Sequence, residues 1–491
     1  MGPYVLAVDQ GTGSTKALLL DTAGAVVARA AVPLAETHPG PGLVEQDPGA
    51  LVDSVRTAVA ACLEGHDPHS VEGLALSTQR ESVVLWEAAT GRPVAPLVSW
   101  QDQRGGDRLA RLARAGAGAE IQRRTGLPLD PMFSAPKMAA LLDAHDPDRA
   151  LSGAGTLRLG TVDAYLLHTF TGRADTEIGN ASRTQLLDLA TGDWDDGLLA
   201  AFDVPRAALG RVVPSDGPFG TVRGLPPLAD GTPLRAVLGD SHAALFAHAG
   251  WRPGTVKVTY GTGSSAMTVG EPEPAGAPEP AGEVCGTIAW STGRPVHARE
   301  ANIRSTGRTL AWLGALLGVP AAGIVELAEG ADAGEVTLVP AFGGLGAPWW
   351  DARAVPVLTG FGLDTGRERL ARAALDSVAY QVNDVLAALP PARRVVADGG
   401  LSRSDVLMRT QADVSDVVVA RAAHHDLSAA GAAHLAGLGL GLWTRRDLEE
   451  RADRDLCVFA PSGDAAARTR TVARWHRALA AARDLGARPS G

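Results

Sequence analysis

The feature that most constrains this chain is a short glycine- and hydroxyl-rich motif that occurs twice, about half a chain apart. The segment VLAVDQGTGSTKALLLD covers residues 5–21, and VKVTYGTGSSAMTV covers residues 256–269. Each places GTGS between two apolar runs. Repetition of such a unit indicates two related halves. We therefore expect two domains, 1–247 and 248–491, with a hinge near residues 244–254.

The first motif is expected to form a β-hairpin. After the loop the apolar run resumes at Thr15–Leu20, pauses at DTAGA and continues as VVARAAV, which predicts a meander of strands. A Rossmann or P-loop site would instead lead the glycine loop directly into a helix. The loop is therefore predicted to be a hairpin that clamps phosphate.

Composition favours a globular protein with small-molecule ligands. The chain has 491 residues, 45% of them apolar and 20% charged, enough to bury large cores in two domains. A net charge of −10 disfavours nucleic acid or an anionic membrane as the main partner. Cys62, Cys285 and Cys457 are odd in number and far apart, so neither a disulfide framework nor a zinc site is indicated. We expect a cytoplasmic protein without a secretion signal or a membrane span, and read the apolar segment 428–443 as a buried helix.

Three further segments carry recognisable local signals. Asp47 and Pro48 predict the start of a helix whose apolar face comprises Leu51, Val55, Val59 and Leu63. The segment RRVVADGGLSRSDVLM predicts a strand, a glycine pair and a helix with Ser402 as its N-cap. The proline- and glycine-rich stretch 271–283 is interpreted as an exposed insertion.

Many segments in a fixed order resemble the FGGY carbohydrate kinases, and among them most closely the glycerol kinases. They run over nearly the whole chain: the first hairpin, HPGPGLVEQDP, STQRESVVLW, VSWQDQR, GTVDAYLLHTFTG, GNASRTQLLDLATGDWDD, LGDSHAALF, TYGTGSSA, PAFGGLGAPWWD, ADGGLSRSDVLM and SAAGAAHLAGLGLGLW. The resemblance implies two α/β domains of the actin, Hsp70 and hexokinase type, which is ribonuclease H-like, with ATP and Mg²⁺ as cofactors and a small polyol or sugar as substrate.

The hairpin loops supply the groups that phosphate requires. Gly11 and Gly13 let backbone N–H groups approach phosphate oxygens, and Thr12, Ser14 and Thr15 add hydroxyl donors. Asp9 would bind the magnesium ion, because that cation prefers oxygen ligands. A tight hairpin whose aspartate only caps the turn is the alternative. In the second copy Tyr260 is taken to replace the acid, leaving Gly261, Thr262 and Gly263 to contact phosphates. The resemblance adds the following nucleotide contacts: Gly307, Gly399, Gly400 and Ser404.

Asp240 is the candidate general base. It is a lone acid where an apolar strand ends and a helix begins, which is the edge where α/β folds bind ligands. In the family, the aspartate of this Gly-Asp pair accepts the proton of the substrate hydroxyl, and we also expect it near the metal. A helix N-cap is the rival explanation.

Four residues are expected to contact the acceptor. Arg80 and Glu81 lie between two predicted strands and offer donors and acceptors to the hydroxyls of a polyol. Trp100 could pack an apolar face against the C–H edge of the substrate, and Asp102 follows it in the same matched segment.

Three positions depart from the glycerol kinase pattern. Met132, Ser241 and Ser265 stand where those enzymes carry tyrosine, glutamine and phenylalanine at positions that face the substrate. Losing a phenol and an amide removes partners for a small triol, and the two serines enlarge the site. We infer an acceptor larger than glycerol; a true glycerol kinase with altered affinity is the alternative. Control by fructose bisphosphate is not expected, since the glycine-rich, arginine-bearing stretch associated with it is missing before Asp240.

Other classes of function stay open at this point. An actin- or Hsp70-type nucleotide switch would need the hairpins but not the acceptor residues. A non-catalytic relative would bind sugar without turnover, although both aspartates of the predicted chemistry are present. A homodimer is one expectation for the assembly.

Overall fold

The computed structural model describes residues 2–270, 284–423, 426–454 and 456–487, so the predicted insertion at 271–283 lies outside the described residues. Contacts divide the chain into two compact units. Unit 1 comprises 1–249, 286–298 and 426–452, and unit 2 comprises 250–285, 299–425 and 453–491. The first continuous segment of unit 1 thus ends close to the expected boundary at residue 247. Two later segments of the chain, 286–298 and 426–452, also belong to unit 1. The roles expected for the two domains stay predictions.

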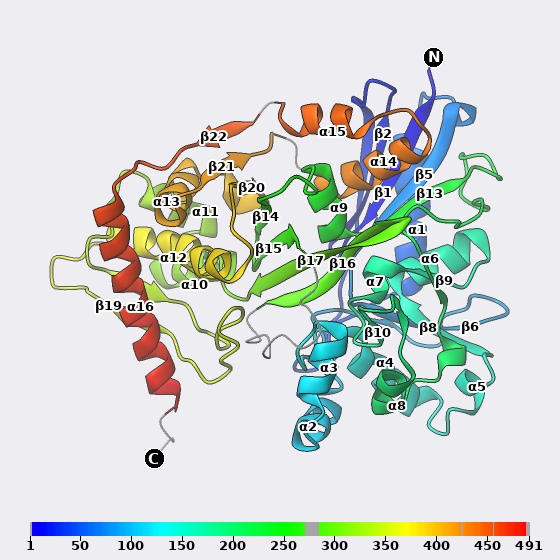
Figure 1. Ribbon diagram of the computed structural model, residues 1–491, viewed down its shortest axis with the longest axis horizontal. Coiled ribbons are helices and arrows are strands. Elements are labelled where there is room, and N and C mark those ends of the chain that lie inside the picture. Colours follow the sequence, from blue (N-terminus) through cyan, green and yellow to red (C-terminus); the bar gives the residue numbers. More distant parts are fainter. Residues whose placement is uncertain (1, 271–283, 424–425, 455, 488–491) are drawn as a thin grey trace. The chain divides into compact units, whose positions relative to one another are not determined.

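Unit 1 is built on a five-stranded sheet in the order β13-β5-β1-β2-β3 (Figure 1). The strands are β1 (Tyr4–Gln10), β2 (Ser14–Leu20), β3 (Val26–Pro33), β5 (Val71–Thr78) and β13 (Leu234–Gly239). The first three form the predicted antiparallel meander, whereas β5 runs parallel to both β1 and β13. The parallel strands are buried apart from one residue in each of them, as strands covered on both faces are.

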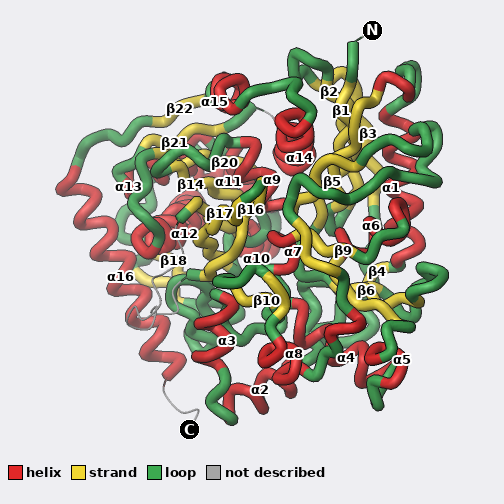
Figure 2. The backbone as a smooth tube through the Cα atoms, turned by 45° about the vertical axis from the view of Figure 1, so that its right-hand side comes forward, coloured by secondary structure: helices red, strands yellow, loops and turns green. Residues whose placement is uncertain are grey.

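Helices from distant parts of the chain pack on this sheet. Helix α1 (Pro48–Cys62) contacts β1, β2 and β3, and begins as predicted, with the Asp47 side chain accepting from Gly49 N–H. Helix α14 (Leu427–Gly439) contacts β5, β1 and β13, and packs closely on α9 (Asp240–Ala247) (Figure 2). At Gly431 a side chain would meet the Ala243 carbonyl oxygen at 1.8 Å.

A smaller part of unit 1 adds a four-stranded sheet in the order β4-β7-β6-β8. Its strands are β4 (Glu45–Gln46), β6 (Val83–Glu87), β7 (Leu97–Val98) and β8 (Leu157–Thr161). The helices of unit 1 are completed by α2 (Gly106–Arg114), α3 (Gly118–Thr125), α4 (Ser134–His145), α5 (Ala150–Gly153), α6 (Val162–Thr171), α7 (Ile178–Ala181), α8 (Asp196–Phe202) and α15 (Arg445–Ala452). Short pairs join β9 (Asp175–Glu177) with β12 (Arg211–Val213), and β10 (Leu187–Asp188) with β11 (Asp193–Trp194). Strand β16 (Cys285–Thr292) also belongs to unit 1, except for its first residue.

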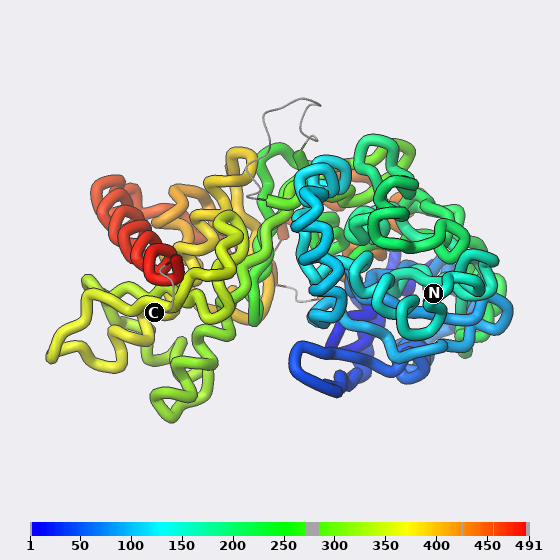
Figure 3. Tube along the Cα trace, turned by 90° about the horizontal axis from the view of Figure 1, so that it is seen from below, coloured from blue at the N-terminus to red at the C-terminus, as the bar shows by residue number. Residues whose placement is uncertain are grey.

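Unit 2 contains the second hairpin in a sheet ordered β17-β15-β14-β20-β21-β22. Its strands are β14 (Thr255–Tyr260), β15 (Ser264–Val269), β17 (Arg294–Ile303), β20 (Arg394–Asp398), β21 (Val418–Arg421) and β22 (Cys457–Phe459), where β17 begins in unit 1. The helices are α10 (Gly307–Leu317), α11 (Ala321–Ala328), α12 (Arg367–Ala388), α13 (Asp405–Ser415) and α16 (Ala465–Ala487). Helix α16 lies against the β18 (Thr337–Val339) and β19 (Val357–Thr359) pair. Figure 3 shows α16 as the red helix.

One predicted helix start is wrong. Helix α13 is capped by Ser404, whose hydroxyl accepts from Leu407 N–H, while Ser402 lies in the preceding 3₁₀ turn. Its hydroxyl bonds instead to the Gly399 carbonyl oxygen at 2.7 Å. The glycine pair thus leads into a tight turn before the helix begins.

Within the described residues, no single helix is both long enough and apolar enough to cross a membrane. Helices α10 and α11 meet the two criteria only when they are taken together, and this pair is bent by 91°.

Candidate functional site

The candidate site of unit 1 lies where three parallel strands end at the same edge of the sheet. In the pairing of β1 with β5, Asp9 stands opposite Ser77, and in the pairing of β13 with β5, Gly239 stands opposite Thr78. Asp240 and the segment that follows Thr78 therefore emerge beside Asp9. This is the edge at which α/β sheets bind ligands.

Asp9 and Asp240 are near enough to interact electrostatically. Ser77 Oγ donates to Asp9 Oδ1 at 2.8 Å. Burial and, after it, the charge of Asp240 raise the pKa of Asp9 to about 7, although the Ser77 hydrogen bond and the Lys16 charge oppose the shift. Two carboxylates that disfavour each other's charge are a donor set that a divalent cation would stabilise.

Asp240 is the first residue of α9 and does not cap it, since Gly239 occupies the N-cap position. Its Oδ1 accepts from Ser241 N–H at 2.6 Å and lies 3.4 Å from Arg80 Nε, and its side chain is 38% exposed. Because Gly239 and not Asp240 is the N-cap residue, the N-cap alternative is wrong. A side chain at Gly239 would meet Arg80 Cδ at 2.6 Å, so the arginine can lie here only because that position is glycine.

His242 is a site residue that the sequence analysis missed. It is fully buried, and its Nε2 lies 3.2 Å from Arg80 Nη1 and 3.4 Å from Thr287 Oγ1. Since a guanidinium can only donate, Nε2 is the acceptor in the first contact. In the sequence, only the position of His242 two residues after Asp240, in the expected helix, pointed to a role in the site.

Glu81 is oriented by a buried arginine that the sequence analysis also missed. Arg183 Nε donates to Glu81 Oε1 at 2.7 Å, and its guanidinium lies 5.2 Å from the centre of the Phe133 ring. Glu81 adopts a positive φ of 63°, which non-glycine residues seldom do and which is often found at functional sites. Ser134 Oγ donates to its carbonyl oxygen at 3.1 Å.

The loop that carries Met132 is tied to a buried lysine. Lys137 Nζ donates to the carbonyl oxygens of Pro131 and Phe133 at 3.0 and 2.9 Å, and also to that of Met132. Burial lowers the pKa of Lys137 to about 7. Met132 and Ser241 are both half-buried in this unit.

The structure separates Trp100 from Asp102. Trp100 is 38% exposed, and its Nε1 donates to Thr12 Oγ1 of the hairpin loop at 3.0 Å. Asp102 is fully buried, and its carboxylate accepts from the backbone N–H of Val44 and from the backbone and guanidinium of Arg104. The structure does not bring Asp102 to the exposed side of the site.

The first hairpin loop combines an open position with fixed neighbours. Gly11 N–H donates to Ser14 O at 3.0 Å, and a Cβ at exposed Gly13 would meet nothing within 4 Å. This open space is where a phosphate could approach the backbone. Thr15 Oγ1 instead lies 2.6 Å from Ser54 Oγ in the interior, so its hydroxyl is turned away from the loop.

In unit 2 the predicted nucleotide residues lie around the second hairpin. Gly307 N–H donates to Gly261 O at 3.0 Å, and Arg308 N–H donates to Thr262 O at 3.0 Å. A side chain at Gly263 would meet Ile303 O at 2.8 Å. Of the other predicted positions, Gly399 has a φ of 88° and lies against the Tyr260 backbone, Gly400 faces open space, and Ser265 pairs with Thr259 and is half-buried.

The order of residues before the two glycine loops corrects one sequence interpretation. Counting back from the glycines, Gln10 corresponds to Tyr260 and Asp9 to Thr259, so Tyr260 does not replace the acid. Both residues next to the loop are fully buried, and Tyr260 OH donates to Gln411 Oε1 at 3.1 Å.

Among the described residues, no group of three or more His, Cys, Asp or Glu side chains is arranged to bind a metal ion. Magnesium is usually bound by one or two carboxylates together with substrate phosphates and water. The Asp9 and Asp240 pair fits that pattern.

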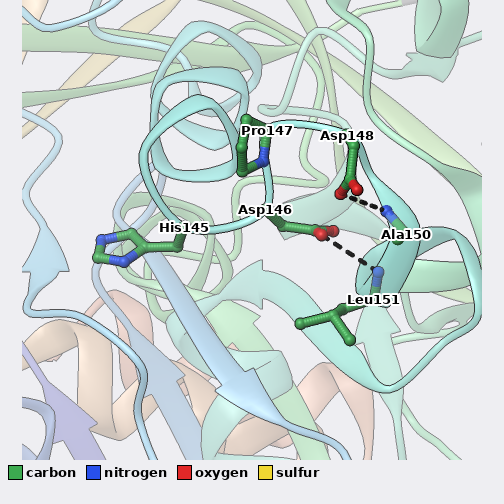
Figure 4. A pocket seen from close by; sticks show the side chains of 6 residues that line it. All are labelled: His145, Asp146, Pro147, Asp148, Ala150 and Leu151. Atoms are coloured by element: carbon green, nitrogen blue, oxygen red, sulfur yellow. Dashed lines mark hydrogen bonds between the residues drawn. The ribbon is translucent and has the colours of Figure 1, made fainter.

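One surface hollow of unit 1 carries no comparable chemistry. It has a volume of about 640 Å³ and is lined by the following residues from the end of α4 to the start of α5 (Figure 4): His145, Asp146, Pro147, Asp148, Ala150 and Leu151. Its two carboxylates accept from the backbone N–H groups of Leu151 and Ala150 and so stabilise a turn.

Comparison with known proteins places this geometry in context. Residues 4–247 match the N-terminal domain, and residues 256–440 the C-terminal domain, of the FGGY family of carbohydrate kinases. The chain is 41% identical to an apulose kinase from Pectobacterium atrosepticum, over 98% of each sequence. It is 40% identical to a glycerol kinase from Aromatoleum aromaticum, over 98% of this chain and 99% of that one. The solved glycerol kinase of Plasmodium falciparum with ADP superposes with a TM-score of 0.91 over 98% of each chain at 24% identity, which shows the fold alone.

Proposed function

Since this chain belongs to the FGGY family of carbohydrate kinases, it has the actin-like ATPase fold and phosphorylates a sugar or polyol hydroxyl with ATP; we propose that its acceptor is larger than glycerol. The observation that carries the proposal is the set of three departures at Met132, Ser241 and Ser265. The apulose and glycerol kinases are almost equally similar, at 41% and 40% identity, so overall similarity does not decide between these acceptors.

The residues of unit 1 suggest how the transfer is performed. Asp240 accepts the proton of the acceptor hydroxyl, and Arg80, 3.4 Å from Asp240, favours the ionised carboxylate that a proton acceptor needs. Arg80 and Glu81 bind neighbouring hydroxyls, while Trp100 packs on the C–H edge. When bound at Asp9 beside Asp240, Mg²⁺ neutralises phosphate charge.

The test of the acceptor compares initial rates with ATP for glycerol, erythritol, xylitol, myo-inositol, D-xylulose and D-apulose. We expect kcat/KM for one of the larger acceptors to exceed that for glycerol at least tenfold. A clear preference for glycerol would establish the second candidate, a glycerol kinase, the activity named for several of the similar relatives. Release of ADP without any acceptor dependence would instead indicate a nucleotide switch of the actin or Hsp70 type.

The base assignment is tested separately. Replacing Asp240 with asparagine should lower kcat at least about a hundredfold with every acceptor, since general base catalysis contributes 10²–10⁴-fold. The predicted homodimer and cytoplasmic location stay predictions, which sedimentation and cell fractionation can test.

A further inference from the structure

Three buried glutamine side chains meet beneath the first hairpin loop of unit 1. Gln10 ends β1, Gln46 ends β4, and Gln79 follows β5, and none is more than 1% exposed. Gln79 Nε2 donates to Gln46 Oε1 at 3.0 Å and to Gln10 Oε1 at 3.2 Å. Buried amides that are fully paired fix one geometry, because any rotation leaves a polar group unpaired.

On one side this amide cluster supports the loop. Gln46 Nε2 donates to Thr12 O at 2.7 Å, and Gln10 Nε2 donates to Gly11 O at 2.8 Å. The backbone of the loop expected to approach phosphate is thus bonded to two of the three amides.

On the other side it supports the acceptor residues. Ser82 Oγ donates to Gln79 Oε1 at 2.8 Å and accepts from Trp100 N–H at 3.0 Å. Arg80 and Glu81 lie between Gln79 and Ser82 in the chain. The two ends of this short segment are therefore fixed by a single side chain.

Both amide hydrogens of Gln79 donate and its oxygen accepts, so its orientation is set by the three contacts. We propose that Gln79 is a positioning residue that fixes the phosphate loop in register with Arg80, Glu81 and Trp100, so that the phosphoryl group and the acceptor hydroxyl are aligned. The inference rests on the site residues proposed above. Misalignment by about 1 Å can cost a hundredfold in rate even when binding is retained.

The test replaces Gln79 with methionine, which is similar in size but lacks all three hydrogen bonds, and with glutamate, which retains only the acceptor for Ser82. Thr125→Val is the matched control: it removes a buried hydroxyl of unit 1 that makes contacts with Ile121 and Leu127, neither of which is assigned to the site. Glycerol and D-apulose are the acceptors, and ATP hydrolysis without acceptor is measured in parallel.

We expect kcat of both Gln79 variants to fall at least tenfold, while calorimetric Kd values for ATP and acceptor change less than threefold. Thr125→Val should lower Tm but keep kcat within twofold. Unchanged kcat in a folded Gln79 variant, or a loss explained wholly by weaker binding, would overturn the proposal. If Gln79→Met does not fold, Gln79→Glu and the single-arm variant Gln46→Met decide by the same criterion. Asp240→Asn measured alongside distinguishes the two claims: full activity there refutes the site, not the alignment by Gln79.

Discussion

The two GTGS hairpins share a backbone plan but place their charge differently. In unit 1 the acid Asp9 lies on the hairpin strand β1 and faces Ser77 on the neighbouring parallel strand. In unit 2 the hairpin strand β14 carries Thr259, and the acid, Asp398, lies on the neighbouring strand β20. A duplicated scaffold can therefore diverge by placing its carboxylate on the other strand of a parallel pair. The loops differ as well, since four residues lie between the paired Gln10 and Thr15 but three between Tyr260 and Ser264.

The largest difference between the two hairpins is expected when the polar strand residue two positions before the first glycine is replaced, which is Asp9 in unit 1 and Thr259 in unit 2. Asp9→Asn should lower kcat at least about a hundredfold, because the group predicted to bind the metal is lost. Thr259→Val should change kcat less than about threefold. Steady-state kinetics over a range of Mg²⁺ concentrations measures both, and an equal loss in the two variants would show that the hairpins have equivalent roles.

Alanine substitutions in the two loops should have different effects, because Gly263 is closely surrounded and Gly13 is not. Gly263→Ala must move the Ile303 carbonyl, which a Cβ would meet at 2.8 Å, and we expect a loss of about 1–3 kcal/mol in unfolding free energy. Gly13→Ala meets nothing within 4 Å, so its Tm should stay within a degree or two while its KM for ATP rises about tenfold. Thermal unfolding and ATP titrations of both variants provide the check; destabilisation by Gly13→Ala would contradict the open loop.

Two buried acids of unit 1 predict how the stability of the fold depends on pH. Burial raises the pKa of Glu177 to about 7 and that of Asp163 to about 6 in unit 1. An acid whose pKa is higher when folded stabilises the fold fully below its unfolded pKa, and that stability is lost as pH rises through the folded pKa. Unfolding free energy should thus fall between pH about 4.5 and 7, by on the order of 3 kcal/mol for Glu177. Urea titrations of Glu177→Gln should show a flatter profile, whatever its absolute stability; an unchanged slope would assign the pH dependence elsewhere.

The smallest effect is expected at the buried residue beside the second loop. Tyr260→Phe removes one hydroxyl, which donates to Gln411, and should cost about 1 kcal/mol with kcat unchanged. Burial raises the pKa of Tyr260 well above its ordinary value, so the hydroxyl is a neutral donor at every working pH. A large kinetic effect in this variant would give the second hairpin a chemical role that its charge pattern does not indicate.

Much of the fold could be predicted because its signals are local. The hairpins, the helix that starts at Asp47 and the strand–Asp240–helix segment all follow from glycine, capping and apolar periodicity within a few residues. Arg183, His242 and Gln79 could not be found this way, because each depends on partners between 33 and 162 positions away in the chain. The mistaken alignment of Tyr260 with Asp9 has a simpler cause: Gln10 separates Asp9 from the first glycine, whereas Tyr260 directly precedes Gly261.

The return of α14 to unit 1 has a consequence for biosynthesis. This helix covers β5, β1 and β13, yet it is specified by residues 427–439, after most of unit 2. On the ribosome, the first 249 residues therefore emerge without the element that covers their central strands. That apolar surface stays bare until the final tenth of the polypeptide is being synthesised, so a nascent chain of this protein is a natural client for chaperones, and a fragment cut at the apparent domain border would be prone to aggregate.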